Sequence, residues 1–141
     1  ASAPYNLPKE VNLRGYHPNY EGHPKQVESA LELILASERP VVYAGGGVIL
    51  SNASAELQEL ARLLSLPVTT TLMGMGCFPG SDPLCLGMLG MHGTYAANLA
   101  ISHADLIVAL GEWVIDQALD LGCCIVTFTE GDPLLVMTYS I

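Results

Sequence analysis

Four short runs of apolar or β-branched residues, alternating with segments of helical periodicity, constrain the fold of this chain more than any other feature. The runs are residues 41–44 (VVYA), 68–71 (VTTT), 106–110 (LIVAL) and 123–128 (CCIVTF). Strands that are apolar along their whole length are typical of a parallel sheet covered on both faces. The sequence therefore predicts an α/β fold, a three-layer, Rossmann-like parallel sheet with helices on both faces.

Three segments between these runs have the spacing of helices. After Pro24, apolar residues recur at i, i+3, i+4 and i+7 through Leu35. Residues 53–64 repeat leucine and alanine along one stripe, and residues 93–104 are small enough to pack closely against a neighbour. Residues 1–23 carry three prolines and no sustained periodicity, so we expect a linker or arm there. Residues 24–141 then form a single domain, incomplete or altered at its C-terminal end.

In a parallel sheet, ligands bind beyond the carboxyl ends of the strands. The residues at those ends are Gly45–Gly47, Leu72–Gly74, Gly111 and Glu130, which predict the rim of a site. The three consecutive glycines lie between a strand and a helix, as in dinucleotide-binding loops, but they lack the GxGxxG pattern and also fit an ordinary tight turn. Glu130 fits either a ribose hydroxyl or a solvated turn.

The segment from residue 68 to residue 95 is unusually rich in glycine and methionine. It contains five glycines and four methionines before His92-Gly93. Glycine allows backbone to pass close to a bulky, flat or phosphorylated ligand, and methionine fits irregular shapes. A glycine-rich loop between core strands is the alternative interpretation. His92 likewise fits a ligand donor or a hydrogen-bonded core residue.

Charge and composition exclude several classes of function. The net charge is −9, all five cations lie within the first 62 residues, and residues 63–141 hold seven acids. Nucleic-acid binding is excluded by this distribution, and a phosphate in the second half must be met by backbone N–H groups. The cysteine and histidine spacing predicts no metal site. No apolar run reaches 18 residues, which predicts no membrane span, and the absence of a signal-like start predicts a cytoplasmic protein.

Residues 39–111 closely resemble the central domain of the acetolactate (acetohydroxyacid) synthase large subunit. The strings TTLMGMG and LGMLGMHGTYAANLA carry the resemblance, and PNYEGHPKQVESAL resembles the segment that leads into that domain. Members of this family use thiamine diphosphate and Mg²⁺ to decarboxylate pyruvate and join the product to a second 2-keto acid, in branched-chain amino acid biosynthesis. Their central domain holds an FAD that performs no net redox chemistry. The resemblance therefore implies a nucleotide-binding domain in this chain.

The resemblance also implies which residues contact the FAD. The glycines of the first strand-to-helix turn would approach the dinucleotide, the end of the second strand would touch it, and the glycine–methionine string would line the flavin. The implied cofactor-binding residues are Gly45, Gly46, Gly47, Thr71, Leu72, Leu89, Gly90, Met91, His92, Gly111 and Glu130. No catalytic or metal-binding residue is implied in this chain.

After Gly111 the chain departs from the family pattern. Trp113 and Gln117 stand where the family has two arginines, and Asp116 matches one of the family's acids. Each charged hydrogen bond is worth about 1.5–3 kcal/mol, so two lost arginines weaken the expected hold on an anionic cofactor. The family's thiamine-activating glutamate and its Mg²⁺-binding Gly-Asp-Gly…Asn pattern are not within these 141 residues, so we expect no catalysis by the chain alone.

Two hypotheses follow from this comparison. The chain is the FAD-binding central domain of a synthase, or it is a stand-alone nucleotide-binding or interaction module that kept the fold and lost the catalysis. Half of the residues are apolar, which predicts surfaces covered by other protein. The expected partners are a second copy of the chain in a homo-oligomer, and the family's other domains or a regulatory subunit.

Overall fold

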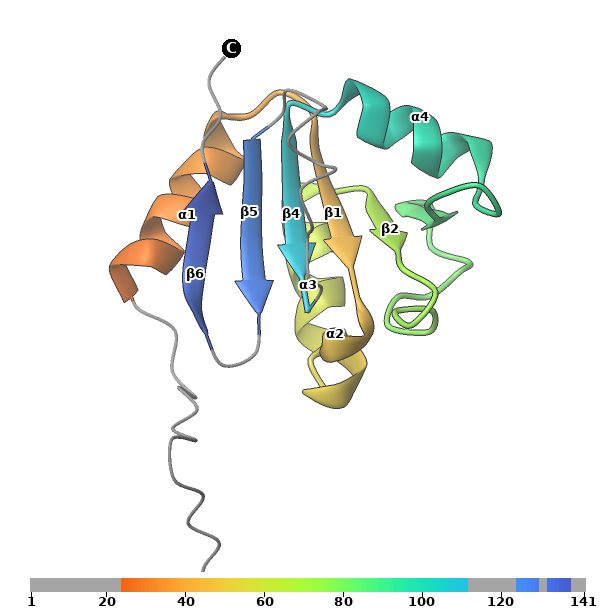
Figure 1. Cartoon of the computed structure of the whole chain (residues 1–141), viewed down its shortest axis with the longest axis horizontal. Helices are drawn as coiled ribbons and strands as arrows, with labels where there is room; N and C mark the ends of the chain where they lie inside the picture. Colours follow the sequence, from red (N-terminus) through yellow and green to blue (C-terminus); the bar gives the residue numbers. More distant parts are fainter. Residues whose placement is uncertain (1–23, 112–123, 130–131, 138–141) are drawn as a thin grey trace, which may run out of the picture.

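The computed structural model describes residues 24–111, 124–129 and 132–137. The predicted arm at residues 1–23, together with Trp113, Asp116, Gln117 and Glu130, lies outside these ranges. The described chain forms one six-stranded sheet in the order β3-β2-β1-β4-β5-β6 (Figure 1). The strands are β1 Pro40–Ala44, β2 Val68–Thr70, β3 Cys85–Met88, β4 Leu106–Leu110, β5 Cys124–Thr129 and β6 Asp132–Met137.

All neighbouring strands from β3 to β5 run parallel, and β6 pairs antiparallel with β5. The parallel part agrees with the fold that the apolar runs predict. The sequence left open whether the C-terminal residues join the sheet, and β6 does so as an edge strand. Edge position suits Pro133, because proline cannot donate a ladder hydrogen bond and is confined to edges or strand starts.

Helices cover both faces of the sheet and so confirm the three layers. The helices are α1 Pro24–Ala36, α2 Gly46–Leu50, α3 Ser54–Leu64 and α4 Tyr95–His103. On one face, residues of α1 and α3 pack with Val42 and Val108 in the larger core cluster. On the other face, Ile101 of α4 packs with Val41 and Ile107. Successive strand residues point to opposite faces, which is why unbroken apolar strands need both layers. No helix among the described residues is long and apolar enough to cross a membrane.

Asp105 ties the start of β4 to the connection that precedes β1. Its carboxylate accepts the N–H groups of Glu38 at 2.7 Å and Arg39 at 2.9 Å. Burial opposes ionisation of this carboxyl, but the two N–H groups and the charge of Arg39 outweigh it and hold its pKa below the ordinary value. The amino ends of the two central strands are therefore held in register by one side chain.

Candidate functional site

The strands β3, β2, β1 and β4 end on one line across the sheet. Their last residues pair in a row, in the order Met88, Thr70, Ala44 and Leu110. The next residues continue the row: the N–H of Gly45 donates to the Leu110 carbonyl at 2.8 Å, and that of Thr71 donates to the Ala44 carbonyl at 2.9 Å. The structure therefore brings four of the predicted site residues to one edge: Gly45, Thr71, Leu89 and Gly111.

The order of the strands reverses between β1 and β4, because β2 and β3 lie on one side of β1 and β4 lies on the other. Such a switch point is where open α/β sheets bind ligands. Here the two strand ends touch directly. The N–H of Gly47 donates to the Gly111 carbonyl at 3.0 Å. A Cβ on Gly47 would lie 2.8 Å from the Gly111 Cα, and Gly111 itself has φ +61°. This close backbone contact, just beyond the ends of β1 and β4, requires glycine at both positions.

The same contact reduces the number of backbone N–H groups in the first turn of α2 that could bind an anion. A helix start normally presents several N–H groups without partners. In α2, the N–H of Gly47 is taken by Gly111, and the N–H of Val48 reaches the Gly45 carbonyl at 3.3 Å. Of the three N–H groups from Gly46 to Val48, that of Gly46 alone makes no such hydrogen bond. The triple glycine is therefore mainly a packing feature.

The segment after β2 turns its apolar side chains outward. Leu72, Met73 and Met75 are 69%, 76% and 58% exposed. Gly74 lies beneath them, and a Cβ at this position would lie 2.3 Å from the carbonyl oxygen of Ala44. The glycine lets the segment pack on the end of β1, and the neighbouring side chains form an apolar surface at the edge of the sheet.

The segment after β3 forms a tight turn from Gly90 to Gly93, closed by a hydrogen bond of 2.9 Å from the Gly93 N–H to the Gly90 carbonyl. Met91 and His92 occupy the tip, where Met91 is 92% exposed. The exposure of His92 rules out the core-histidine interpretation. Gly90 has φ +105°, and no atom lies within 4 Å of where its Cβ would be. The space beside Gly90 is therefore open at the predicted flavin side.

The described cations are placed away from this edge. Lys25 lies at the start of α1, which packs mainly beside β6 rather than beside β1–β3 (Figure 1), and Arg39 precedes β1 at the opposite end of the sheet. Arg62 of α3 is engaged with the Asp82 carboxylate at 3.0 Å. The Leu84 N–H and this guanidinium hold the pKa of Asp82 below its ordinary value. A phosphate at the described carboxyl edge would therefore be met by backbone, as the charge distribution predicts.

Cys77 and Cys85 have a structural setting. Cys77 is buried, and its burial raises the pKa of the thiol. Cys85 is half-buried in β3. The described residues contain no cluster of histidine, cysteine, aspartate or glutamate that could hold a metal ion.

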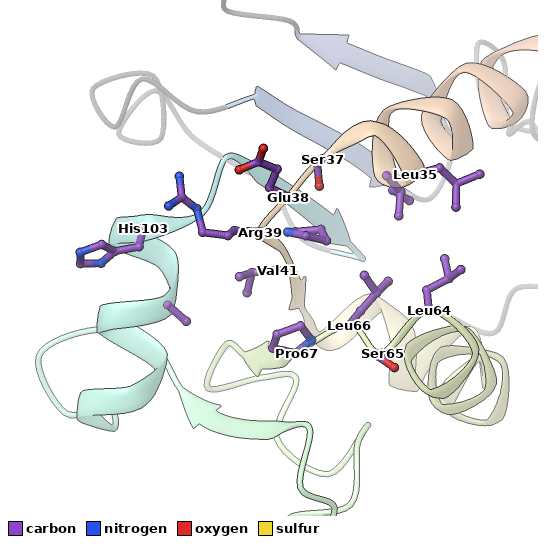
Figure 2. Close-up of a pocket in the computed structure, with 13 residues that line it drawn as sticks. Leu35, Ser37, Glu38, Arg39, Val41, Leu64, Ser65, Leu66, Pro67 and His103 are labelled. Carbon is purple, nitrogen blue, oxygen red and sulfur yellow. The ribbon is translucent and has the colours of Figure 1, made fainter.

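A cavity of about 590 Å³ opens at the other end of the sheet, beside the amino ends of β1 and β2 (Figure 2). Leu35, Leu64 and Leu66 lie on one side, and Arg39 and His103 lie on the side of α4. The sequence did not predict this cavity, because its walls come from the ends of three helices that are far apart in the chain. None of the predicted site residues lines it.

Residues 27–120 match the sequence model of the family described as "Thiamine pyrophosphate enzyme, central domain". The match covers most of the chain, so the chain belongs to this family of central domains. Within that class, its relatives are acetolactate synthase large subunits, which confirms the resemblance noted in residues 39–111.

A probable acetolactate synthase large subunit of Methanocaldococcus jannaschii is 56% identical over 107 residues, which are 76% of this chain and 18% of that protein. The acetolactate synthase large subunit of Buchnera aphidicola subsp. Schlechtendalia chinensis is 54% identical over 108 residues, 77% of this chain and 19% of that protein. The isozyme 3 large subunit of Escherichia coli is 46% identical over 108 residues, with the same coverage of 77% and 19%. The chain thus matches less than a fifth of the length of these relatives.

Proposed function

We propose that this chain binds FAD at the carboxyl edge of its sheet, as the central domain of an acetolactate synthase large subunit. The observation that carries the proposal is the common line on which the strands end. It places Gly45, Thr71, Leu89 and Gly111 side by side, at a switch point where sheets of this class bind ligands. These are residues that the family resemblance implies as FAD contacts.

The apolar part of the edge suits a flat ring system. Ligand pockets are lined mainly by apolar side chains, with few polar groups. Leu72 and Met91 are exposed on the segments that follow β2 and β3. The open space beside Gly90 would allow a ring to approach the backbone. Methionine is flexible and polarisable, so it adapts to the face of an isoalloxazine.

Few hydrogen-bond donors are present among the described residues to bind the diphosphate of FAD. In the first turn of α2, the N–H of Gly46 is the group that remains for it, and Trp113 and Gln117 replace the two arginines that the family resemblance leads us to expect. Losing two charged hydrogen bonds of about 1.5–3 kcal/mol each weakens binding by roughly a hundredfold to ten-thousandfold. We therefore expect FAD binding by the chain alone to be weak and driven by the flavin.

The chemistry of the parent enzyme is proposed as a further step. The condensation of pyruvate with a second 2-keto acid, with thiamine diphosphate and Mg²⁺, would belong to a protein of the relatives' full length. The 141 residues alone would supply the FAD-binding part of it and no catalytic residue.

Titration of the purified chain with FAD tests the proposal. We expect quenching of flavin fluorescence and co-elution of a flavin absorption band after equilibrium dialysis. Leu72→Asp should abolish binding, because Leu72 lies at the edge. Leu63→Asp is the matched control, because Leu63 is similarly exposed (74%, against 69% for Leu72) but belongs to α3. Absence of binding, or equal losses in the two variants, would contradict the proposal.

A stand-alone nucleotide-binding or interaction module is the second candidate function. It is favoured by the contact between Gly47 and Gly111, which occupies an amide that a dinucleotide could otherwise use. An interaction module would bind neither FAD nor ADP while remaining folded, whereas a stand-alone nucleotide-binding module would bind ADP and not FAD.

The exposed apolar side chains at the edge also support a proposed homo-oligomer, or contact with other parts of the parent enzyme or a regulatory subunit. Light scattering should then show dimers or larger assemblies. A monodisperse monomer at high concentration would contradict the homo-oligomer.

A further inference from the structure

The turn from Gly90 to Gly93 is held by one side chain of α4. The side-chain amide of Asn98 accepts the Gly90 N–H at 3.2 Å and donates to the Gly90 carbonyl at 3.0 Å. It also donates to the Thr94 carbonyl at 2.9 Å. Both backbone polar groups of Gly90 are thus bound by one amide, and both donors of that amide are used.

The helix that carries Asn98 is itself fixed to the sheet. Ala97 and Ile101 of α4 are buried. The hydroxyl of Thr94 accepts the Ala97 N–H at 3.1 Å as the helix cap and donates to the Leu86 carbonyl of β3. The position of Asn98 is therefore set by the core and by the neighbouring strand.

The tip of the turn has no comparable support. Met91 is 92% exposed, so the described chain does not pack around it. The direction in which Met91 and His92 point is consequently set at the base of the turn, where Asn98 holds Gly90 at φ +105°. A free glycine would sample several conformations at this position, and fixing them on binding would cost affinity.

We propose that Asn98 is a positioning residue that holds the Gly90–Gly93 turn ready for the flavin ring. The inference rests on the proposed FAD site and adds a residue whose side chain bonds to backbone groups of Gly90 and Thr94. It predicts that the side chain acts on the flavin half of the ligand and not on the adenine half, because its hydrogen bonds reach the turn and not the triple glycine.

The test compares Asn98→Ala and Asn98→Asp with the wild type and with Ser102→Ala. Aspartate keeps the acceptor for the Gly90 N–H and loses both donors. Ser102 is the matched control, because it also lies on α4 and its hydroxyl makes one hydrogen bond away from the turn. That bond goes to the backbone carbonyl of Asn98 at 2.8 Å. The dissociation constants for FAD, riboflavin and ADP are measured by equilibrium dialysis, and the urea midpoint of each variant by circular dichroism.

We expect Asn98→Ala and Asn98→Asp to weaken FAD and riboflavin binding about tenfold. Without the Asn98 hydrogen bonds, the turn would have to become ordered when the ligand binds, and that ordering costs affinity. ADP binding and the Ser102→Ala variant should stay unchanged. Equal weakening of ADP and riboflavin would indicate a merely structural role and overturn the inference, as would wild-type flavin affinity in Asn98→Ala. Failure of the wild type to bind FAD would instead overturn the proposed function, and the inference with it.

Discussion

Gly74→Ala should destabilise the chain more than the same substitution at Gly80 or Gly90, two other glycines of the glycine–methionine segment. A Cβ at this position would lie 2.3 Å from the Ala44 carbonyl oxygen, where ordinary contacts begin near 3.4 Å. The end of β1 or the segment itself would have to move by about 1 Å. Overpacking of this kind costs about 1–3 kcal/mol.

The displaced carbonyl has a second role that raises the cost. The oxygen of Ala44 accepts the Thr71 N–H at 2.9 Å, which ties the end of β2 to β1. Weakening that hydrogen bond adds about 1 kcal/mol. We therefore expect Gly74→Ala to lower the free energy of unfolding by about 2–4 kcal/mol. At roughly 3 °C per kcal/mol for a chain of this size, Tm should fall by about 6–12 °C.

Two glycines of the same segment serve as controls. Gly80 has no atom within 4 Å of its Cβ position and no positive φ, so Gly80→Ala should be neutral or stabilise by about 0.4–1 kcal/mol. Gly90 is equally open but has φ +105°. Gly90→Ala should therefore cost about 1–2 kcal/mol through backbone strain alone.

Urea unfolding of the three variants, followed by circular dichroism, measures these differences. The expected order of stability is Gly80→Ala, then Gly90→Ala, then Gly74→Ala. If Gly74→Ala were as stable as Gly80→Ala, the close contact with Ala44 would not be what requires glycine at this position. The requirement would then lie in ligand approach, as the sequence alone suggested.

Two further substitutions test the opposite end of the sheet. Asp105→Ala removes the acceptor of two backbone N–H groups and should lower the free energy of unfolding by about 1–2 kcal/mol at pH 7, at the low end for charged hydrogen bonds because the carboxylate is partly exposed. The pKa of Asp105 is lower in the folded chain than in the unfolded chain. The stability that wild type gains over Asp105→Ala is therefore complete above the unfolded pKa and should shrink as the pH falls below about 4. A difference in urea midpoint between the two proteins that is the same at pH 7 and at about pH 2 would contradict this. Ser37→Ala should raise the urea midpoint by the equivalent of about 1 kcal/mol, because the Ser37 hydroxyl is buried without a hydrogen-bond partner. Ser29→Ala is its control, because Ser29 lies at an exposed position of α1. A lower midpoint for Ser37→Ala would refute the reasoning.

The central strands could be predicted because their signal is local. The run LIVAL coincides with β4, and VVYA lacks one residue of β1. Helix α2 could not be predicted, since two of its five residues, Gly46 and Gly47, each disfavour a helix by about 1 kcal/mol. It forms because Val48 is buried in the core and the Ser51 hydroxyl binds the Gly47 carbonyl. Strand β3 also escaped prediction, because Gly87 interrupts its pattern at φ +83°.

The positions of the candidate site could be predicted better than the reasons for its residues. Parallel strands end at one edge, so the predicted residues had to gather there. The sequence does not distinguish a glycine that approaches a ligand from one that approaches the chain itself. Gly47 and Gly74 turned out to be of the second kind, and Gly90 leaves open space. Asn98 gave no signal, because its role depends on a turn eight residues earlier in the chain.

The exposed methionines at the carboxyl edge make this domain a favourable starting point for protein engineering. The glycine contacts beneath Met73 and the hydrogen bonds at the base of the turn hold the framework, while the side chains of Met73, Met75 and Met91 contribute little to it. A library confined to these three positions would therefore vary the chemistry of the edge and leave folding intact. New ring-shaped ligands could be selected for without a parallel selection for stability.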